Sequence, residues 1–206
     1  MQQGPAPPTL LADCTGALVA GGHASRLHGL AKGLLQIEGE PIVARSLRLF
    51  RQLFSTALVV ANDSAPYAAF GAPVVPDVIG GKGAPSGLHT ALTAARTEWV
   101  FTAACDMPFL APEPIMWLAT RREGVRAVVV LWHGQLEPLH AFWSRACLPL
   151  VERMLREGNP SMWMIAIAVG AKLVLEEEWR LVDPDGRAFA NANTPEDAAR
   201  LGLKFP

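Results

Sequence analysis

The chain has 206 residues, half of them hydrophobic and 18% charged, so it can bury one substantial core. A formal net charge of -1 provides no basic surface for a nucleic-acid backbone and favours a small anionic substrate. No apolar run reaches the roughly 20 residues of a membrane-spanning helix. We expect one domain over residues 1–206 that contacts neither nucleic acid nor membrane.

The start of the chain and the cysteines bear on the compartment. The first nine residues are rich in proline and glutamine and lack the pattern of a signal peptide, and residues 1–13 are expected to form a disordered lead-in. Cys14, Cys105 and Cys147 contain no CxxC pair and leave an odd cysteine in any disulfide scheme. We therefore expect reduced thiols in a cytoplasmic protein.

Short apolar runs predict six strands in chain order, over residues 16–20, 56–61, 74–75, 99–104, 127–132 and 136–142. Helical spacing predicts one helix after Pro41 and another after Gly87. Strands that alternate with helices are typical of a mostly parallel sheet, and a tight connection at His133-Gly134 adds an antiparallel pair. The predicted fold is a three-layer α/β/α domain with a mixed sheet.

The first predicted strand ends in a glycine turn, Leu18-Val19-Ala20-Gly21-Gly22. Backbone N–H groups in such a turn can bind an anion, and Arg26 and Lys32 add the positive charge that a triphosphate needs. The turn matches neither GxGxxG nor a Walker loop. The alternative interpretation is that the glycines only reverse the chain and that Lys32 lies on a solvated face.

Polar residues also follow the next strands, with Asn62 after the second, Asp77 after the third and Asp106 after the fourth. Since ligands of open sheets bind beyond the carboxyl ends of the strands, these residues are expected to line one crevice. Asp106 is the candidate ligand for Mg²⁺, which commonly uses one or two carboxylates together with substrate phosphates. The alternative is that Asp106 caps a turn or the helix near Pro112.

Two further segments have distinctive compositions. Residues 80–87 are rich in glycine and predict a flexible loop suited to a nucleotide lid, with Lys82 as an ordinary solvated lysine. Thr194-Pro195-Glu196-Asp197 predicts a capped helix start, which does not explain the preceding Asn191 and Asn193. Asn193 is a candidate to orient a phosphate or a metal-bound water.

Cys105 and His140 lie in or beside predicted strands. Cys105 offers a thiol nucleophile, but no base partner is identifiable and a buried core thiol is the favoured interpretation. His140 alternates with apolar neighbours and is interpreted as a half-buried histidine with satisfied hydrogen bonds, rather than as a crevice residue.

In order and spacing these motifs, together with Pro138-Leu139, closely resemble the molybdenum cofactor guanylyltransferases of the nucleotidyltransferase superfamily over nearly all of residues 16–201. The resemblance implies a Rossmann-like nucleotidyltransferase that transfers GMP from GTP to the phosphate of molybdopterin and releases pyrophosphate, with Mg²⁺ as cofactor. The implied partners are GTP, molybdopterin or molybdenum cofactor, and molybdoenzyme chaperones.

The resemblance also implies roles for individual residues. The backbone of Val19, Ala20 and Gly21 would contact guanine or ribose, and Asn62 and Asp77 would hold the nucleoside. Gly22 and Arg26 complete the nucleotide-binding set. Lys32 and Asp106 would be catalytic, Lys32 by neutralising the triphosphate and Asp106 by binding metal and nucleotide. We expect Lys32→Ala and Asp106→Ala to abolish turnover and to leave the fold intact.

This chain departs from the family pattern at His28, where a glycine is usual, and at Ala31, where an acid is common. Alternative functions are a cytidylyltransferase on the same cofactor, another small-phosphate nucleotidyltransferase, and a catalytically silent nucleotide-binding carrier that delivers the cofactor. The acceptor groove is expected to lie against residues 146–182.

Overall fold

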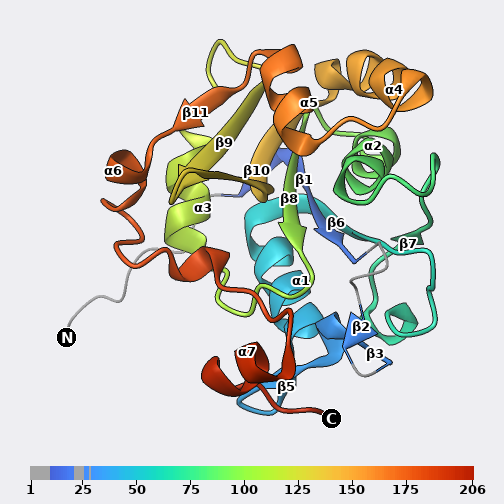
Figure 1. The fold of residues 1–206 in the computed structure, drawn as a ribbon, viewed down its shortest axis with the longest axis vertical. Helices are drawn as coiled ribbons and strands as arrows, with labels where there is room; N and C mark the ends of the chain where they lie inside the picture. Colours follow the sequence, from blue (N-terminus) through green and yellow to red (C-terminus); the bar gives the residue numbers. More distant parts are fainter. Residues whose placement is uncertain (1–9, 21–25, 28) are drawn as a thin grey trace.

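A seven-stranded sheet forms the centre of the computed structural model, which describes residues 10–20, 26–27 and 29–206 (Figure 1). Its strands lie in the order β11-β9-β10-β8-β1-β6-β7. Their bounds are β1 Leu11–Val19, β6 Phe54–Val60, β7 Val74–Val75, β8 Trp99–Ala104, β9 Ala127–Trp132, β10 Gln135–Ser144 and β11 Lys172–Val174. Residues 14–19 of β1 are all buried, because this inner strand is covered on both faces.

The sheet is parallel except for β10. β1 pairs in parallel with β6 and β8, whereas β10 runs antiparallel to both β8 and β9. β9 and β10 are joined by His133 and Gly134, whose φ angles of 47° and 74° are those of a two-residue hairpin turn. The predicted mixed sheet and tight turn are confirmed.

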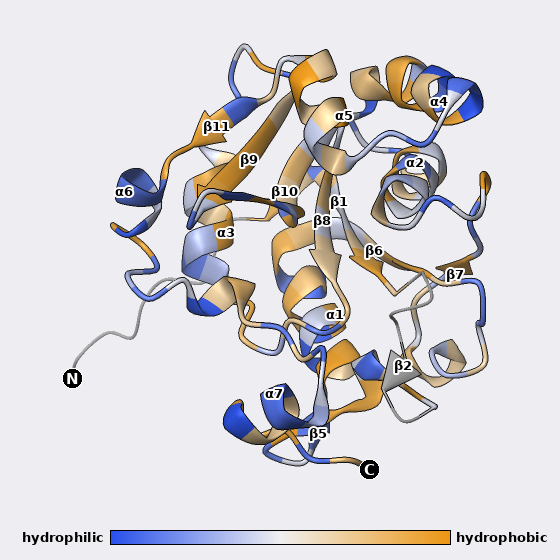
Figure 2. Ribbon diagram, in the orientation of Figure 1, coloured by the Kyte–Doolittle hydropathy of each residue, from blue (hydrophilic) through white to orange (hydrophobic). Residues whose placement is uncertain are grey.

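Helices cover both faces of the sheet, which confirms the predicted three layers (Figure 1). α1 and α3 pack on one face, and α2, α4 and α5 pack on the other. The helix bounds are α1 Ile42–Leu53, α2 Ala84–Ala94, α3 Pro112–Ala119, α4 Leu148–Glu157, α5 Met162–Val169, α6 Glu176–Trp179 and α7 Pro195–Arg200. Figure 2 shows hydrophobic strands at the centre and hydrophilic residues on α6 and α7 at the periphery.

Short elements complete the fold. They are the strand pairs β2 Arg26–Leu27 with β3 Leu30–Ala31 and β4 Gln36–Ile37 with β5 Glu40–Pro41, and the 3₁₀ turns η2 Lys32–Leu34, η3 Ala68–Phe70, η4 Arg145–Cys147 and η5 Arg187–Phe189. A small apolar cluster joins Leu35 and Ile42 to Ala192, Ala198 and Leu203. This cluster brings the last residues of the chain against the segment around η2.

Two predicted boundaries were wrong. The disordered lead-in was expected to cover residues 1–13, but β1 already begins at Leu11, which pairs with Phe54. Residues 1–9 lie outside the described part of the chain. The glycine-rich loop was expected to reach residue 87, but α2 begins at Ala84 and includes Gly87. A glycine is needed inside this helix because a Cβ there would lie 2.5 Å from Cγ1 of Val19.

Gly87→Ala is expected to lower the free energy of unfolding by about 1–2 kcal/mol. Overpacking costs about 1–3 kcal/mol, and the better helix propensity of alanine recovers up to about 1 kcal/mol. Urea unfolding of both proteins measures the difference. The control is Gly80→Ala in the preceding loop, where an added Cβ has no atom within 4 Å. Equal losses in the two variants would show that the contact with Val19 is not the cause.

The second half of the chain contains elements that the sequence did not reveal. They are α4, α5, α6 and the edge strand β11. Within the described ranges, no helix combines the length and apolar content needed to cross a membrane.

Candidate functional site

Lys32 is a buried cation held by two other segments of the chain. It begins η2, and its side chain is only 4% exposed. Its Nζ donates to Oδ2 of Asp106 at 3.1 Å and to Oδ1 of Asn193 at 2.6 Å. Lysine is rarely buried without a partner, and here a carboxylate and an amide oxygen compensate the ammonium group. The solvated interpretation of Lys32 is therefore wrong.

Asp106 lies just beyond the carboxyl end of β8, as predicted. Its carboxylate is 14% exposed and binds Lys32, so it faces the site and does not cap α3. Its backbone C=O accepts a hydrogen bond from Ala192 N–H at 3.3 Å. Asp106 thus joins the end of a sheet strand to the C-terminal segment that carries Asn193.

Helix capping positions Asn193 just before α7. Thr194 Oγ1 accepts from Asp197 N–H, and the Asp197 carboxylate accepts from the N–H groups of both Thr194 and Asn193. This confirms the predicted capping box. The Asn193 side chain also donates to Oδ1 of Asn191 at 2.6 Å, so one asparagine orients the other toward Lys32.

Asn62 and Asp77 form a second polar pair at the same edge of the sheet. Asn62 Nδ2 donates to Oδ2 of Asp77, and Asp77 N–H donates to Oδ1 of Asn62, both at 2.9 Å. They follow β6 and β7, which are parallel to β1 and β8 and therefore end at the same edge. The structure brings these two predicted residues together, and their contact with a nucleoside stays a prediction.

The glycine turn is described only in part. Gly21 and Gly22 lie outside the described residues, as does His28. Arg26 pairs with Ala31 in the β2–β3 hairpin, and its side chain also lies outside the described part.

The end of β1 is held firmly by its neighbours. Val19 C=O accepts from Cys105 N–H at 3.1 Å, and Ala20 N–H donates to Val60 C=O at 2.8 Å. Both residues are buried. These backbone groups fix the start of the turn, and their predicted contact with the nucleotide remains to be tested.

Cys105 and Tyr67 are buried and lie against Gly33, the residue after Lys32. A Cβ on Gly33 would lie 3.1 Å from Cε1 of Tyr67 and 3.5 Å from Cβ of Cys105, so a glycine fits this close approach. Burial raises the pKa of the Cys105 thiol to about 12, which makes it a poor nucleophile and supports the structural interpretation. The three cysteines are all free, as expected. Ala31, which stands where the resembling family commonly has an acid, is also buried.

His140 differs from its interpretation as a half-buried, hydrogen-bonded histidine. It is completely buried, and neither ring nitrogen has a hydrogen-bond partner among the described residues. Its ring packs edge to face against Phe101, Trp179 and Phe189. Burial lowers its pKa to about 4. It is therefore a neutral member of an aromatic cluster.

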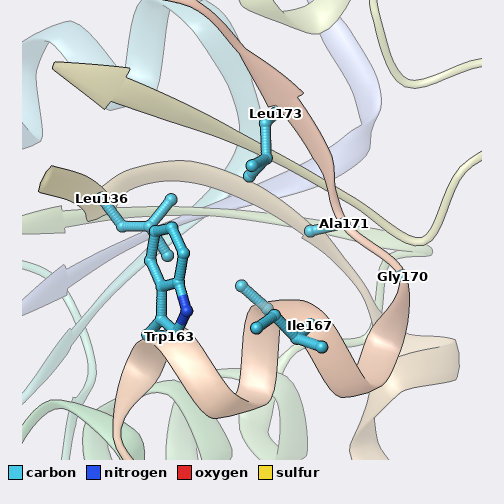
Figure 3. A pocket seen from close by; sticks show the side chains of 7 residues that line it. Leu136, Trp163, Ile167, Gly170, Ala171 and Leu173 are labelled. Carbon is cyan, nitrogen blue, oxygen red and sulfur yellow. The ribbon is translucent and has the colours of Figure 1, made fainter. Parts of the chain in front are cut away.

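An apolar hollow lies between α5 and the β11 edge of the sheet, at the opposite end of the molecule from α7 (Figures 1 and 3). Leu136, Trp163, Ile167 and Leu173 line it. Because this lining contains no charged side chain, it offers nothing that would hold a triphosphate. The residues around Lys32 therefore remain the candidate site.

Sequence reasoning missed a stack between Arg187 and Phe109. The guanidinium carbon of Arg187 lies 4.4 Å from the centroid of the Phe109 ring. Phe109 comes three positions after Asp106, but no local pattern indicates which distant arginine covers its ring. The site therefore combines Lys32, Asp106 and Asn193 with the nearby Arg187 stack, an arrangement suited to binding and neutralising phosphates.

Comparisons with known proteins agree with this geometry. Residues 16–170 match the model of the MobA-like NTP transferase domain. The chain is 34% identical over 187 residues to the probable molybdenum cofactor guanylyltransferase of Pelotomaculum thermopropionicum, with 90% of each chain covered. It is 31% identical to the molybdenum cofactor guanylyltransferase of Desulfosudis oleivorans, over 89% of this chain and 91% of that one.

The fold has a close structural counterpart. The crystal structure of molybdopterin-guanine dinucleotide biosynthesis protein A from Archaeoglobus fulgidus superposes with a TM-score of 0.77 at 24% identity. The match covers 90% of this chain and 95% of the other. The predicted nucleotidyltransferase fold is confirmed.

Proposed function

Because the chain belongs to the MobA-like NTP transferase family, we propose that it transfers GMP from GTP to the phosphate of molybdopterin and releases pyrophosphate. One observation carries the proposal beyond the names of its relatives. Lys32 is buried between Asp106 and Asn193, so three distant segments converge on a single cation at the carboxyl edge of the sheet.

The reaction needs positioning and charge compensation more than proton transfer. An oxygen of the acceptor phosphate attacks the α-phosphorus of GTP, and the bond from that phosphorus to the bridging oxygen breaks as pyrophosphate leaves with the electron pair. Since the attacking phosphate is already ionised, no strong general base is needed. Lys32 would offset the negative charge on the triphosphate, while Asn62 and Asp77 would hold the nucleoside.

The residues at the site fit Mg²⁺. Among the described residues no three His, Cys, Asp or Glu side chains gather, so Asp106 would act as a single carboxylate with the substrate phosphates supplying further oxygens. Within that same part of the chain, only Oδ2 of its two carboxylate oxygens has a hydrogen-bond partner. Mg²⁺ held there would reduce the charge on the transferring and leaving phosphates.

Pyrophosphate release by the purified protein, with Mg²⁺ and molybdopterin, tests the proposal when GTP, CTP and ATP are compared. We expect release with GTP and loss of release when EDTA removes the metal. Release with CTP alone would favour the cytidylyltransferase. Tight GTP binding without release would favour the silent carrier.

The same proposal covers compartment and partners. The free, buried thiols suit a reducing cytoplasm. Molybdoenzyme chaperones stay expected partners, and a pull-down with an apo-molybdoenzyme and its chaperone tests that contact.

A further inference from the structure

Arg187 and Phe109 belong to two segments that run side by side at the site. One segment follows β8 and contains Asp106 and Phe109; the other contains η5 and leads to Asn193. They touch at two places, through the hydrogen bond from Ala192 N–H to Asp106 C=O and through the stack of Arg187 on Phe109. Only two residues, Met107 and Pro108, separate Asp106 from Phe109, so the Cα atoms of Asp106 and Phe109 lie at most roughly 11 Å apart.

Arg187 has its charged group available. Among the described residues, no carboxylate forms an ion pair with Arg187, and no oxygen accepts a hydrogen bond from its guanidinium group. Its side chain is exposed, and the aromatic face of Phe109 supports one side of the planar group. The edge of the guanidinium group therefore remains free to bind a phosphate with two parallel hydrogen bonds.

The backbone that carries Arg187 is fixed in advance. Asp183 is buried, and its carboxylate accepts from Arg187 N–H and from Ala188 N–H, both at 2.9 Å. Trp179 Nε1 donates to the same carboxylate at 3.3 Å. Because the backbone and the ring face are both set before any ligand arrives, binding a phosphate costs Arg187 little conformational entropy.

From this geometry we infer that Arg187 binds the phosphate monoester of the acceptor and holds it for attack, while Lys32 serves the triphosphate. The assignment rests on the proposed transfer to a phosphate acceptor. It gives the η5 segment, which lies outside the matched residues 16–170, a role in acceptor binding.

Equilibrium binding of molybdopterin without GTP tests the role of Arg187 separately from turnover. We expect Arg187→Ala to raise the Kd for molybdopterin about 10-fold to 100-fold, as for loss of a charged hydrogen bond. Arg187→Lys keeps the charge but loses the planar guanidinium group, so its Kd for molybdopterin should lie between those of the wild type and Arg187→Ala. Inorganic phosphate should compete with molybdopterin for the wild-type protein and compete less well for Arg187→Ala.

Steady-state kinetics adds a second readout. The KM for molybdopterin should rise in Arg187→Ala while the KM for GTP stays unchanged. The control is Arg153→Ala, which removes an exposed arginine from α4, on the face opposite α1. Equal molybdopterin affinity in Arg187→Ala and the wild type would overturn the inference and leave the proposed function standing. A rise in the KM for GTP would also overturn it. No molybdopterin binding and no pyrophosphate release by the wild-type protein would overturn both.

Discussion

Replacing Lys32 by methionine is expected to lower turnover at least about 100-fold, with the same loss for Asp106→Asn. Under the proposed function each variant removes a charge that would act on the triphosphate or its metal, and preorganised charge stabilisation of this kind commonly contributes about 10²–10³ in rate. The measurement is pyrophosphate release at saturating GTP and molybdopterin. The control is Lys172→Met, which removes an exposed lysine from the β11 edge strand.

The buried pairing changes the expectation for stability. Lys32 and Asp106 were expected to be replaceable without harm to the fold, but their side chains are only 4% and 14% exposed and lie 3.1 Å apart. Removing the lysine leaves a largely buried carboxylate without its counter-charge, which costs stability. We expect Lys32→Met to unfold at lower urea concentration than Asp106→Asn, whose amide oxygen still accepts from Lys32.

The double variant Lys32→Met/Asp106→Asn separates the role of the pair in turnover from its role in stability. Because it contains no unpaired charge, it should regain most of the stability that Lys32→Met loses, while its turnover stays as low as that of the single variants. Recovery of turnover together with stability would show that the pair is structural only. Near-normal turnover in either folded single variant would remove that residue from the catalytic assignment.

Features governed by local rules were predictable from the sequence. The hairpin at His133-Gly134 needs left-handed backbone that glycine adopts easily, and the α7 start is encoded by a threonine cap with an aspartate three residues later. Asp106, Asn62 and Asp77 were found by placing polar residues after strands. Their meeting at one edge follows from the parallel sheet.

Features that depend on packing between distant segments were not predictable. α5 is apolar around its whole circumference, so no face periodicity separates it from a strand. Gly87 has the composition of a loop residue, and its place inside a helix depends on the methyl group of Val19. The burial of Lys32 and the Arg187 stack require the C-terminal segment to pack against residues 35–42, and no short motif encodes that contact.

His140→Phe is expected to stabilise the protein and to flatten its stability profile in mild acid. Burial lowers the pKa of His140 to about 4, compared with about 6.5 when the chain is unfolded. Between these values the unfolded state binds the proton and the folded state does not, so stability falls as the pH falls from 6.5 to 4. The full loss is on the order of 3 kcal/mol.

Phenylalanine keeps the edge-to-face contacts with Phe101, Trp179 and Phe189 and removes two ring nitrogens that have no hydrogen-bond partner among the described residues. We therefore also expect about 1–3 kcal/mol of added stability at pH 7. Urea unfolding of wild type and variant from pH 4.5 to 7.5 measures both effects. His89, whose pKa is also lowered by burial, and the carboxyl groups contribute equally to both proteins, so the difference between the curves isolates His140. Parallel stability curves for the two proteins would mean that His140 binds a proton equally well in the folded and unfolded states. A variant less stable than the wild type at pH 7 would mean that the His140 ring nitrogens have hydrogen-bond partners within the core.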